Sequence, residues 1–225
     1  MSGSEGTPAL GRSGSEGAPH RVVRGRVPST GQWLIDPSGL RWWFDSGSLA
    51  LDFACTGPLR GIPGERLDSD EALAAWLAER FDAVDAGARD VRLDDALMLR
   101  GAISRLAVAA ERGAAGEATD VDVVNLFAAM PDVPPSLSGG SRQAGRSQAA
   151  ARQALSTLAR EAVDLLGGGT PGRLRRCDAE DCRILYLDTS RAASRRWCSM
   201  QRCGNRAKVR AHRRRSAERA DRAAG

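Results

Sequence analysis

Two short stretches decide how the C-terminal part of this chain folds: CDAEDC at residues 177–182 and CSMQRC at residues 198–203. Each stretch begins and ends with a cysteine, and fifteen residues separate the two pairs. Two close pairs joined by an insert of hairpin length can bring four thiolates to one point. Zn²⁺ prefers such a point, because it accepts four sulfur ligands tetrahedrally and has no redox chemistry of its own. The spacing predicts one Zn²⁺ per chain, bound by Cys177, Cys182, Cys198 and Cys203.

The residues around the four cysteines argue against a place in an ordinary apolar core. Core cysteines would need apolar neighbours, whereas this stretch is polar and dense in arginine. A module of this size could hardly fold on its own core, so the metal is expected to supply much of its stability. A purely structural zinc in a protein-interaction module, without nucleic acid, remains the alternative.

Charge is distributed unevenly along the chain. The net charge is +5, yet residues 173–225 carry 16 basic and 6 acidic side chains, whereas the other 172 residues carry 17 and 22. A basic terminal module on an acidic body is a common footprint of nucleic-acid binding. The sequence therefore favours DNA as the partner, with RNA or a protein as alternatives.

The segment from Asn205 to about Ala220 is rich in helix formers and follows the last cysteine. A ligand just before a helix start is favourable, since backbone N–H groups there can donate to the thiolate. The cations fall around most of this helix, which suits phosphate contacts better than ordered base reading, although a solvated charged tail is the alternative. Arg206 could aim at a base or lock into the finger, and the structural role is favoured. The candidate nucleic-acid contacts are Arg195, Arg196, Arg206, Lys208, Arg210, Arg213, Arg214 and Arg215.

Upstream of the cysteines, the sequence predicts a mostly helical domain. Residues 1–30 have no periodic apolar pattern and are expected to be disordered. A hairpin is predicted over Gln32–Phe44, and the segment 45–56 fits either a short helix or a strand. Apolar spacing and capping residues, Ser69 and Asp120 among them, predict further helices at about 69–81, 92–112, 120–127 and 147–166.

The predicted fold class is mainly α: a helical N-terminal domain with a short β-hairpin, followed by a small zinc finger made of a β-hairpin and a helix. The β-prone run Arg183–Asp188 is expected to form one arm of the finger's hairpin. The expected boundaries are a disordered tail at 1–30, a helical domain at 31–169, a finger at 170–216 and a basic tail at 217–225. Glycines 167–169 are read as the linker.

Three strings carry a family resemblance: DTS at 188–190, RRWCSM at 195–200 and CGNRAK at 203–208. They resemble the CGNR zinc finger, named for its Cys-Gly-Asn-Arg string, over about residues 173–215. LALDF at 49–53, Thr56 and the helix around Trp76 are similar to the ABATE domain that commonly precedes this finger, over about residues 40–166. The resemblance implies a stress-related transcription regulator with a sensing domain and a DNA-binding finger. Family members usually carry Asn where this chain has Cys55.

Three polar residues of the first domain, Asp52, Arg105 and Asn125, lie near predicted apolar faces. They could line a pocket for a small-molecule ligand, although internal hydrogen bonds are the commoner role of such residues. Cys55 is expected to be an inert core residue rather than a redox sensor.

The aromatic residues and the histidine of the finger have alternative roles as well. Trp197 is expected to pack over the zinc site, with base stacking as the alternative. Trp33, Trp42 and Trp43 are expected to cover the core, and His212 is expected on the surface rather than among the ligands.

No constellation in the sequence indicates catalysis. We find no nucleophile–base pair, phosphate-binding loop or open metal site, and His20 and His212 are not expected to meet. No segment approaches the roughly 20 apolar residues of a membrane helix. An odd cysteine count with one paired cluster fits a reducing compartment. We therefore expect a cytoplasmic binding protein that is not an enzyme and has no membrane partner.

Overall fold

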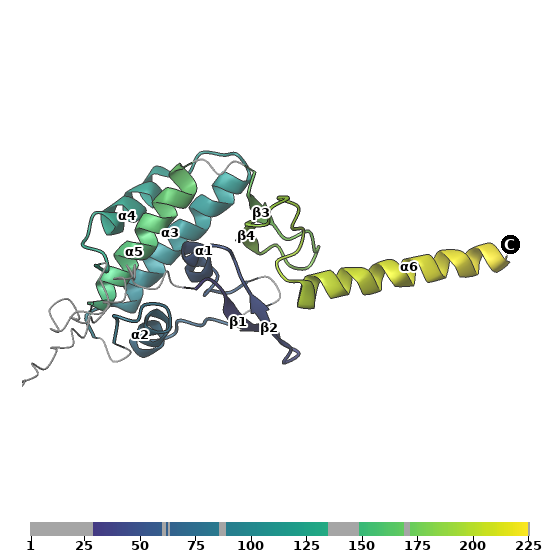
Figure 1. Cartoon of the computed structure of the whole chain (residues 1–225), viewed down its shortest axis with the longest axis horizontal. Coiled ribbons are helices and arrows are strands. Elements are labelled where there is room, and N and C mark those ends of the chain that lie inside the picture. The colour runs from purple at the N-terminus through teal and green to yellow at the C-terminus, as the bar shows by residue number, and fades with distance from the viewer. Residues whose placement is uncertain are drawn as a thin grey trace, which may run out of the picture.

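The computed structural model of the chain describes residues 29–59, 62, 64–85, 89–134, 149–168 and 172–224. The predicted disordered tail lies outside this range except for its last two residues. The described residues form six α-helices, a short π-helix and two antiparallel two-stranded hairpins (Figure 1). This confirms the mainly α class. None of the described helices combines the length and the apolar character that crossing a membrane requires.

Five helices share the larger of two apolar cores. In Figure 1, α3, α4 and α5 lie side by side, with α1 packed against α3 and α5. Their buried stripes include Leu99, Ile103 and Leu158, none of which is exposed to water. The stripes follow the 3.6-residue spacing that predicted them. The bounds are α1 Leu49–Ala54, α2 Asp70–Ala78, α3 Leu93–Glu111, α4 Ala118–Ala128 and α5 Ala151–Gly167.

The segment 45–56, which fits either a short helix or a strand by sequence, contains the helix α1, whose N-terminus is capped. The Ser48 hydroxyl accepts from the backbone N–H of Leu51 at the start of α1. Glu161 of α5 also accepts from the first N–H groups of α1, at 2.8 Å from Leu49 and 2.7 Å from Ala50. A carboxylate is favoured at this positive end of a helix and here ties α1 to α5.

Two helix starts differ from the prediction. Helix α4 begins at Ala118, so Asp120 is not its cap; the Asp120 carboxylate lies in the first turn and accepts from the Arg105 guanidinium at 2.6–3.1 Å. An ion pair to the neighbouring helix thus replaces the expected cap. Helix α5 begins at Ala151 rather than near residue 147. At this start, the Gln153 side chain accepts from the Ala150 backbone N–H at 2.8 Å.

The second core joins the N-terminal hairpin to the cysteine-rich segment. Strands β1 Gln32–Ile35 and β2 Arg41–Phe44 pair in register, and so do β3 Leu174–Arg176 and β4 Leu185–Leu187. The inner face of the first hairpin packs on apolar residues and cysteines of the C-terminal module. The core consists of Leu34, Trp42, Phe44, Cys55, Ile62, Cys177, Ala179, Cys182, Ile184, Tyr186, Cys198 and Cys203.

The expectation that three tryptophans cover the core is correct for Trp42 alone. Trp42 is 1% exposed, whereas Trp33 and Trp43 are 49% and 41% exposed. The reason is the two-residue period of a strand, which turns neighbouring side chains to opposite faces. Trp33 and Trp43 are cross-strand partners on the outer face, where their rings meet edge to face at 5.4 Å between centroids.

Candidate metal centre and basic helix

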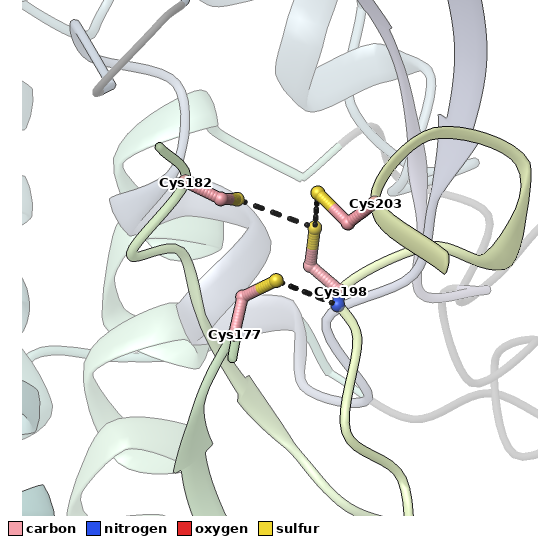
Figure 2. A group of neighbouring side chains, drawn as sticks. All are labelled: Cys177, Cys182, Cys198 and Cys203. Atoms are coloured by element: carbon pink, nitrogen blue, oxygen red, sulfur yellow. Dashed lines mark hydrogen bonds between the residues drawn. The ribbon is translucent and has the colours of Figure 1, made fainter. Parts of the chain in front are cut away.

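The four paired cysteines converge on one point. All four are buried, and their Sγ atoms lie within 4.8 Å of one another (Figure 2). Cys198 Sγ is 3.5 Å from both Cys182 Sγ and Cys203 Sγ. A tetrahedral zinc with Zn–S bonds of about 2.3 Å requires sulfurs about 3.8 Å apart. The donor set and its spacing therefore fit one Zn²⁺ per chain.

Local secondary structure brings the ligands together. Cys177 directly follows β3, and its backbone N–H donates to the Ile184 carbonyl at 2.9 Å, which closes the turn containing Cys182. Arg183, next to Cys182, has φ of +71°, a conformation that non-glycine residues seldom adopt. Cys203 lies in the π-helix Met200–Gly204, which continues directly into α6 Asn205–Ala224. The finger's metal is thereby fixed at the base of α6.

Hydrogen bonds help to neutralise the sulfurs. The Cys198 backbone N–H donates to Cys177 Sγ at 3.4 Å, and Arg206 Nη2 donates to Cys203 Sγ at 3.4 Å. Arg206 also pairs with Asp181 at 2.8 Å. These contacts give Arg206 the locking role within the finger that the sequence favoured.

The protonation of the cluster shows why it suits a cation. Hydrogen bonds from neighbouring thiols, that of Cys182 foremost, lower the pKa of Cys177 to about 7, and such bonds also lower the pKa of Cys203. The same contacts raise the pKa of Cys182 and of Cys198, because a thiolate there would face other sulfurs. Four thiolates at this distance need a compensating positive charge, which Zn²⁺ supplies.

Two residues of the family strings hold the finger's loop. Asp188 is fully buried, and its carboxylate accepts from the backbone N–H of Ser190 and of Arg195, each at 2.9 Å. Burial alone would raise the pKa of Asp188, but hydrogen bonds from Ser190 and Arg195 lower it. The Arg195 guanidinium lies over the Tyr186 ring and donates to the carbonyls of Asp45 and Cys198. The sequence analysis placed Asp188 at the end of a β-prone run and in the DTS string, and no periodicity could have shown its burial.

Helix α6 extends away from the rest of the molecule (Figure 1). It carries eight basic and two acidic side chains, and almost every residue described after Ala211 is exposed. The helix runs to Ala224 without a break, so residues 217–224 are its last turns rather than a separate tail. The sequence offers no Gly or Pro between 205 and 222 that would end the helix earlier.

The predicted nucleic-acid contacts fall into three groups. Lys208, Arg213, Arg214 and Arg215 are exposed and have no ion-pair partner within the part of the chain that is described. Arg206 and Arg210 both pair with Asp181, and Arg196 pairs with Asp178 at 2.8 Å while its side chain stays 68% exposed. Arg195 is occupied inside the protein. The exposed group of α6 is thus the one that can bind a partner without first giving up an ion pair seen among the described residues.

The residues proposed for a ligand pocket are not brought together. Asp52 is buried beneath the N-terminal hairpin, where it accepts from the Gly31 backbone N–H. Arg105 pairs with Asp120 at the surface. Asn125 alone lines a groove, of about 310 Å³, between α3, α4 and α5. Internal hydrogen bonds and ion pairs, the alternative role considered for these residues, account for Asp52 and Arg105.

Three further side chains lie as expected. Cys55 is buried, and burial raises the pKa of its thiol to about 12, so it is protonated at neutral pH. Trp197 is partly buried against the core that contains the cysteines. His212 is exposed on α6 and is not part of the cysteine cluster.

This fold and site define a two-part zinc-finger protein, with a five-helix domain preceding a four-cysteine finger. The ABATE family model, described as "Putative stress-induced transcription regulator", matches residues 47–169, and the CGNR zinc finger model matches residues 173–216. Since the first match covers more than half of the chain, the chain belongs to the ABATE family and carries a CGNR zinc finger. No curated protein shows significant similarity to it.

Proposed function

We propose that the protein regulates transcription by binding duplex DNA through α6, with the zinc finger holding the base of the helix. The observation that carries the proposal is the exposure of α6 on all sides beyond Ala211. The major groove of B-DNA, about 12 Å wide, admits one α-helix. A helix lying in that groove has phosphates on both flanks, so cations around its whole circumference can be used.

The energetics of α6 support a polyanionic partner. The part of α6 beyond Ala211 spans residues 212–224, a length at which isolated helices are marginal in water, and most helices gain their stability by packing an apolar face. Helix α6 has no such face beyond Ala211, and Arg213, Arg214 and Arg215 repel one another. DNA would relieve this repulsion and release counterions. The basic helix is therefore better suited to a nucleic acid than to water alone.

The proposal assigns the metal a structural role. Four cysteine ligands leave no open coordination position, whereas catalytic zinc sites keep one. We accordingly propose binding rather than enzymatic activity. Reduced thiols are required as ligands, which agrees with action in the cytoplasm.

A regulatory role for the helical domain is the second part of the proposal. The groove beside Asn125 is lined by apolar residues of α3, α4 and α5, Ala110 near the end of α3 among them. The next residue of α3, Glu111, pairs with Arg176 of β3 at 2.7 Å. A small apolar ligand in this groove could therefore act on the finger through α3. Filling the groove by Ala110→Leu should change DNA affinity. An unchanged affinity in a folded variant would contradict the regulatory role of the helical domain.

The experiment for the DNA-binding proposal is a salt titration on mixed-sequence duplex, read by fluorescence anisotropy. The logarithm of affinity should fall linearly with the logarithm of salt concentration, with a slope of about −0.9 for each phosphate contacted. Arg213→Ala/Arg214→Ala/Arg215→Ala should weaken binding and make the slope shallower by about 2 to 3.

A charge-matched control distinguishes binding through α6 from the general electrostatic attraction between DNA and any basic residue of the protein. Arg92→Ala/Arg112→Ala/Arg152→Ala removes the same charge from exposed positions of the helical domain. This control should keep the slope of the unaltered protein. An equal loss of DNA affinity in both variants, or the absence of DNA binding at low salt, would overturn the proposal.

A further inference from the structure

A groove of about 560 Å³ lies where the N-terminal hairpin meets the finger. Trp43 of β2 lines it from the first domain, while Trp197 and Met200 line it from the finger. Trp43 is 41% exposed and Met200 is 53% exposed. Two indoles from segments far apart in the sequence therefore border one open hollow.

Neighbouring contacts hold both indoles in place. The Trp43 ring packs so closely on Gly31 that a Cβ there would collide with it, and the ring also meets the Trp33 ring edge to face. On the finger, a Cβ at Gly204 would lie 2.7 Å from Met200 Sδ and 3.3 Å from Trp197 Cδ1. The glycine of the CGNR string thus makes room for these two side chains. Aromatic surfaces fixed in this way lose little entropy when a flat ligand binds.

Two hollows adjoin the groove, and arginines outnumber acidic residues in their combined lining, although Glu111, Asp178 and Glu180 line the larger one. A hollow of about 660 Å³ adjoins the groove through Ser194, Arg195 and Arg196, and its lining includes Arg175 and Arg183. A hollow of about 370 Å³ beside the first turns of α6 adjoins it through Gln201. The three hollows thus place two indoles in the groove and arginines in the two hollows that adjoin it.

We propose that the groove between Trp43 and Trp197 holds an unpaired base of DNA, with the strand's phosphates on the flanking arginines. Single-strand binding sites combine a cationic path for the backbone with aromatic rings on which bases stack. Arg196 lies over the Trp197 ring at 5.0 Å, so a phosphate contact and a stacking surface are adjacent. The inference rests on the proposed function for the class of partner and adds that the protein engages opened or single-stranded DNA.

Charge decides between a base and an apolar protein side chain as the occupant. Among the charged side chains that line the two adjoining hollows, arginines outnumber acidic residues; they include Arg175, Arg183 and Arg196 in one hollow and Arg210 and Arg213 in the other. A cationic path on both sides complements a phosphate backbone that enters and leaves the groove. A protein side chain would need no such path.

Trp43 is the residue to vary, because it lies outside the finger and binds no metal. Trp43→Leu keeps apolar volume but removes the stacking surface, whereas Trp43→Phe keeps an aromatic ring. The zinc-loaded full chain is titrated by anisotropy with an oligothymidine of about 12 nucleotides, a length within the usual range of such sites. A blunt duplex is titrated in parallel. Trp197→Leu is a second test, once its zinc content has been shown to be unchanged.

Trp43→Leu should weaken single-strand binding by about five-fold or more, the effect of losing one stacked base, and leave duplex binding within about two-fold. Trp43→Phe should retain most of the affinity. Equal losses on both DNAs, or a Leu variant that binds the single strand like the unaltered protein, would overturn the inference. Duplex binding that depends on α6 but is accompanied by no single-strand binding would overturn the inference alone. Single-strand binding without any duplex binding would support it and overturn the duplex proposal.

Discussion

Gly47 lies where the backbone of the first domain touches the finger. Its φ is +75°, and a Cβ built there would be 2.6 Å from the Leu187 carbonyl of β4. The neighbouring Ser46 carbonyl accepts from the Leu187 backbone N–H at 2.7 Å. A side chain at position 47 would therefore break a contact between two backbones, neither of which can rotate away.

We expect Gly47→Ala to lower the free energy of unfolding by about 2 kcal/mol or more, through backbone strain and the clash. Gly39→Ala is the matched control, because Gly39 has φ of +82° but open space around it. The control should cost about 1 kcal/mol. Urea unfolding measures both variants, and equal costs would show that the two backbones are not in tight contact at this junction.

Asp52 gives the chain a pH-dependent stability. Burial raises the pKa of Asp52 from 3.8 to about 6, and hydrogen bonds from Gly31 and Ser46 offset only part of this effect. The unfolded chain keeps the lower pKa, so the folded state binds the proton more tightly. The contribution to stability is therefore full below about pH 4 and is lost as the pH rises through about 6.

Relative to Asp52→Asn, the unaltered protein should lose on the order of 1 kcal/mol of unfolding free energy between pH 5 and 7.5. Taking the difference between the two proteins cancels other titrating groups, such as Glu161. Chemical denaturation at several pH values measures it. A difference that stays flat or changes in the opposite direction would contradict the buried state of this carboxyl.

At the scale of elements, the sequence predicted what local patterns encode. Helix α3 was predicted within one residue at each end, because its apolar stripe has a clear helical period, and Ser69 caps α2 as expected. The partner of the N-terminal hairpin was beyond such reasoning, since a strand pattern shows which face is buried but not against what. The strand β3, whose three residues read LRR, and the π-helix before α6 likewise have no local signature.

The shared second core leads to a prediction for metal removal. Leu34, Trp42 and Phe44 of the hairpin pack with the cysteines, so the hairpin should depend on zinc although it lies more than 130 residues away in the sequence. Chelation should raise amide hydrogen exchange in β1 and β2 together with β3 and β4. Helices α3 and α5 should stay protected, because their core contains none of the four ligands.

Mass spectrometry of peptides resolves these segments in one experiment, and re-addition of zinc is the control for reversibility. Retained protection of β1 and β2 without metal would show that the hairpin folds independently of the finger. Simultaneous loss in α3 and α5 would show one cooperative unit instead of two cores.

At the scale of the whole molecule, the acidic helical body and the basic extended helix are joined through the zinc finger. The cysteine spacing predicted the metal site, and the local charge predicted the basic helix, because each signal lies within one short segment of the sequence. The inward role of Arg195 was not predicted, since it and Arg196 are chemically identical neighbours. Only the carbonyls of Asp45 and Cys198, which the fold brings to Arg195, distinguish the two.

The proposed function makes α6 the element that meets DNA, and amide exchange on the zinc-loaded chain with and without duplex tests this most directly. Free α6 should exchange rapidly beyond its first turns, because no packing protects it. Saturating duplex should slow exchange along Lys208–Arg222 and leave α3 and α5 unchanged. Protection that falls on the helical domain instead, or an α6 that exchanges equally fast with and without bound DNA, would contradict the account.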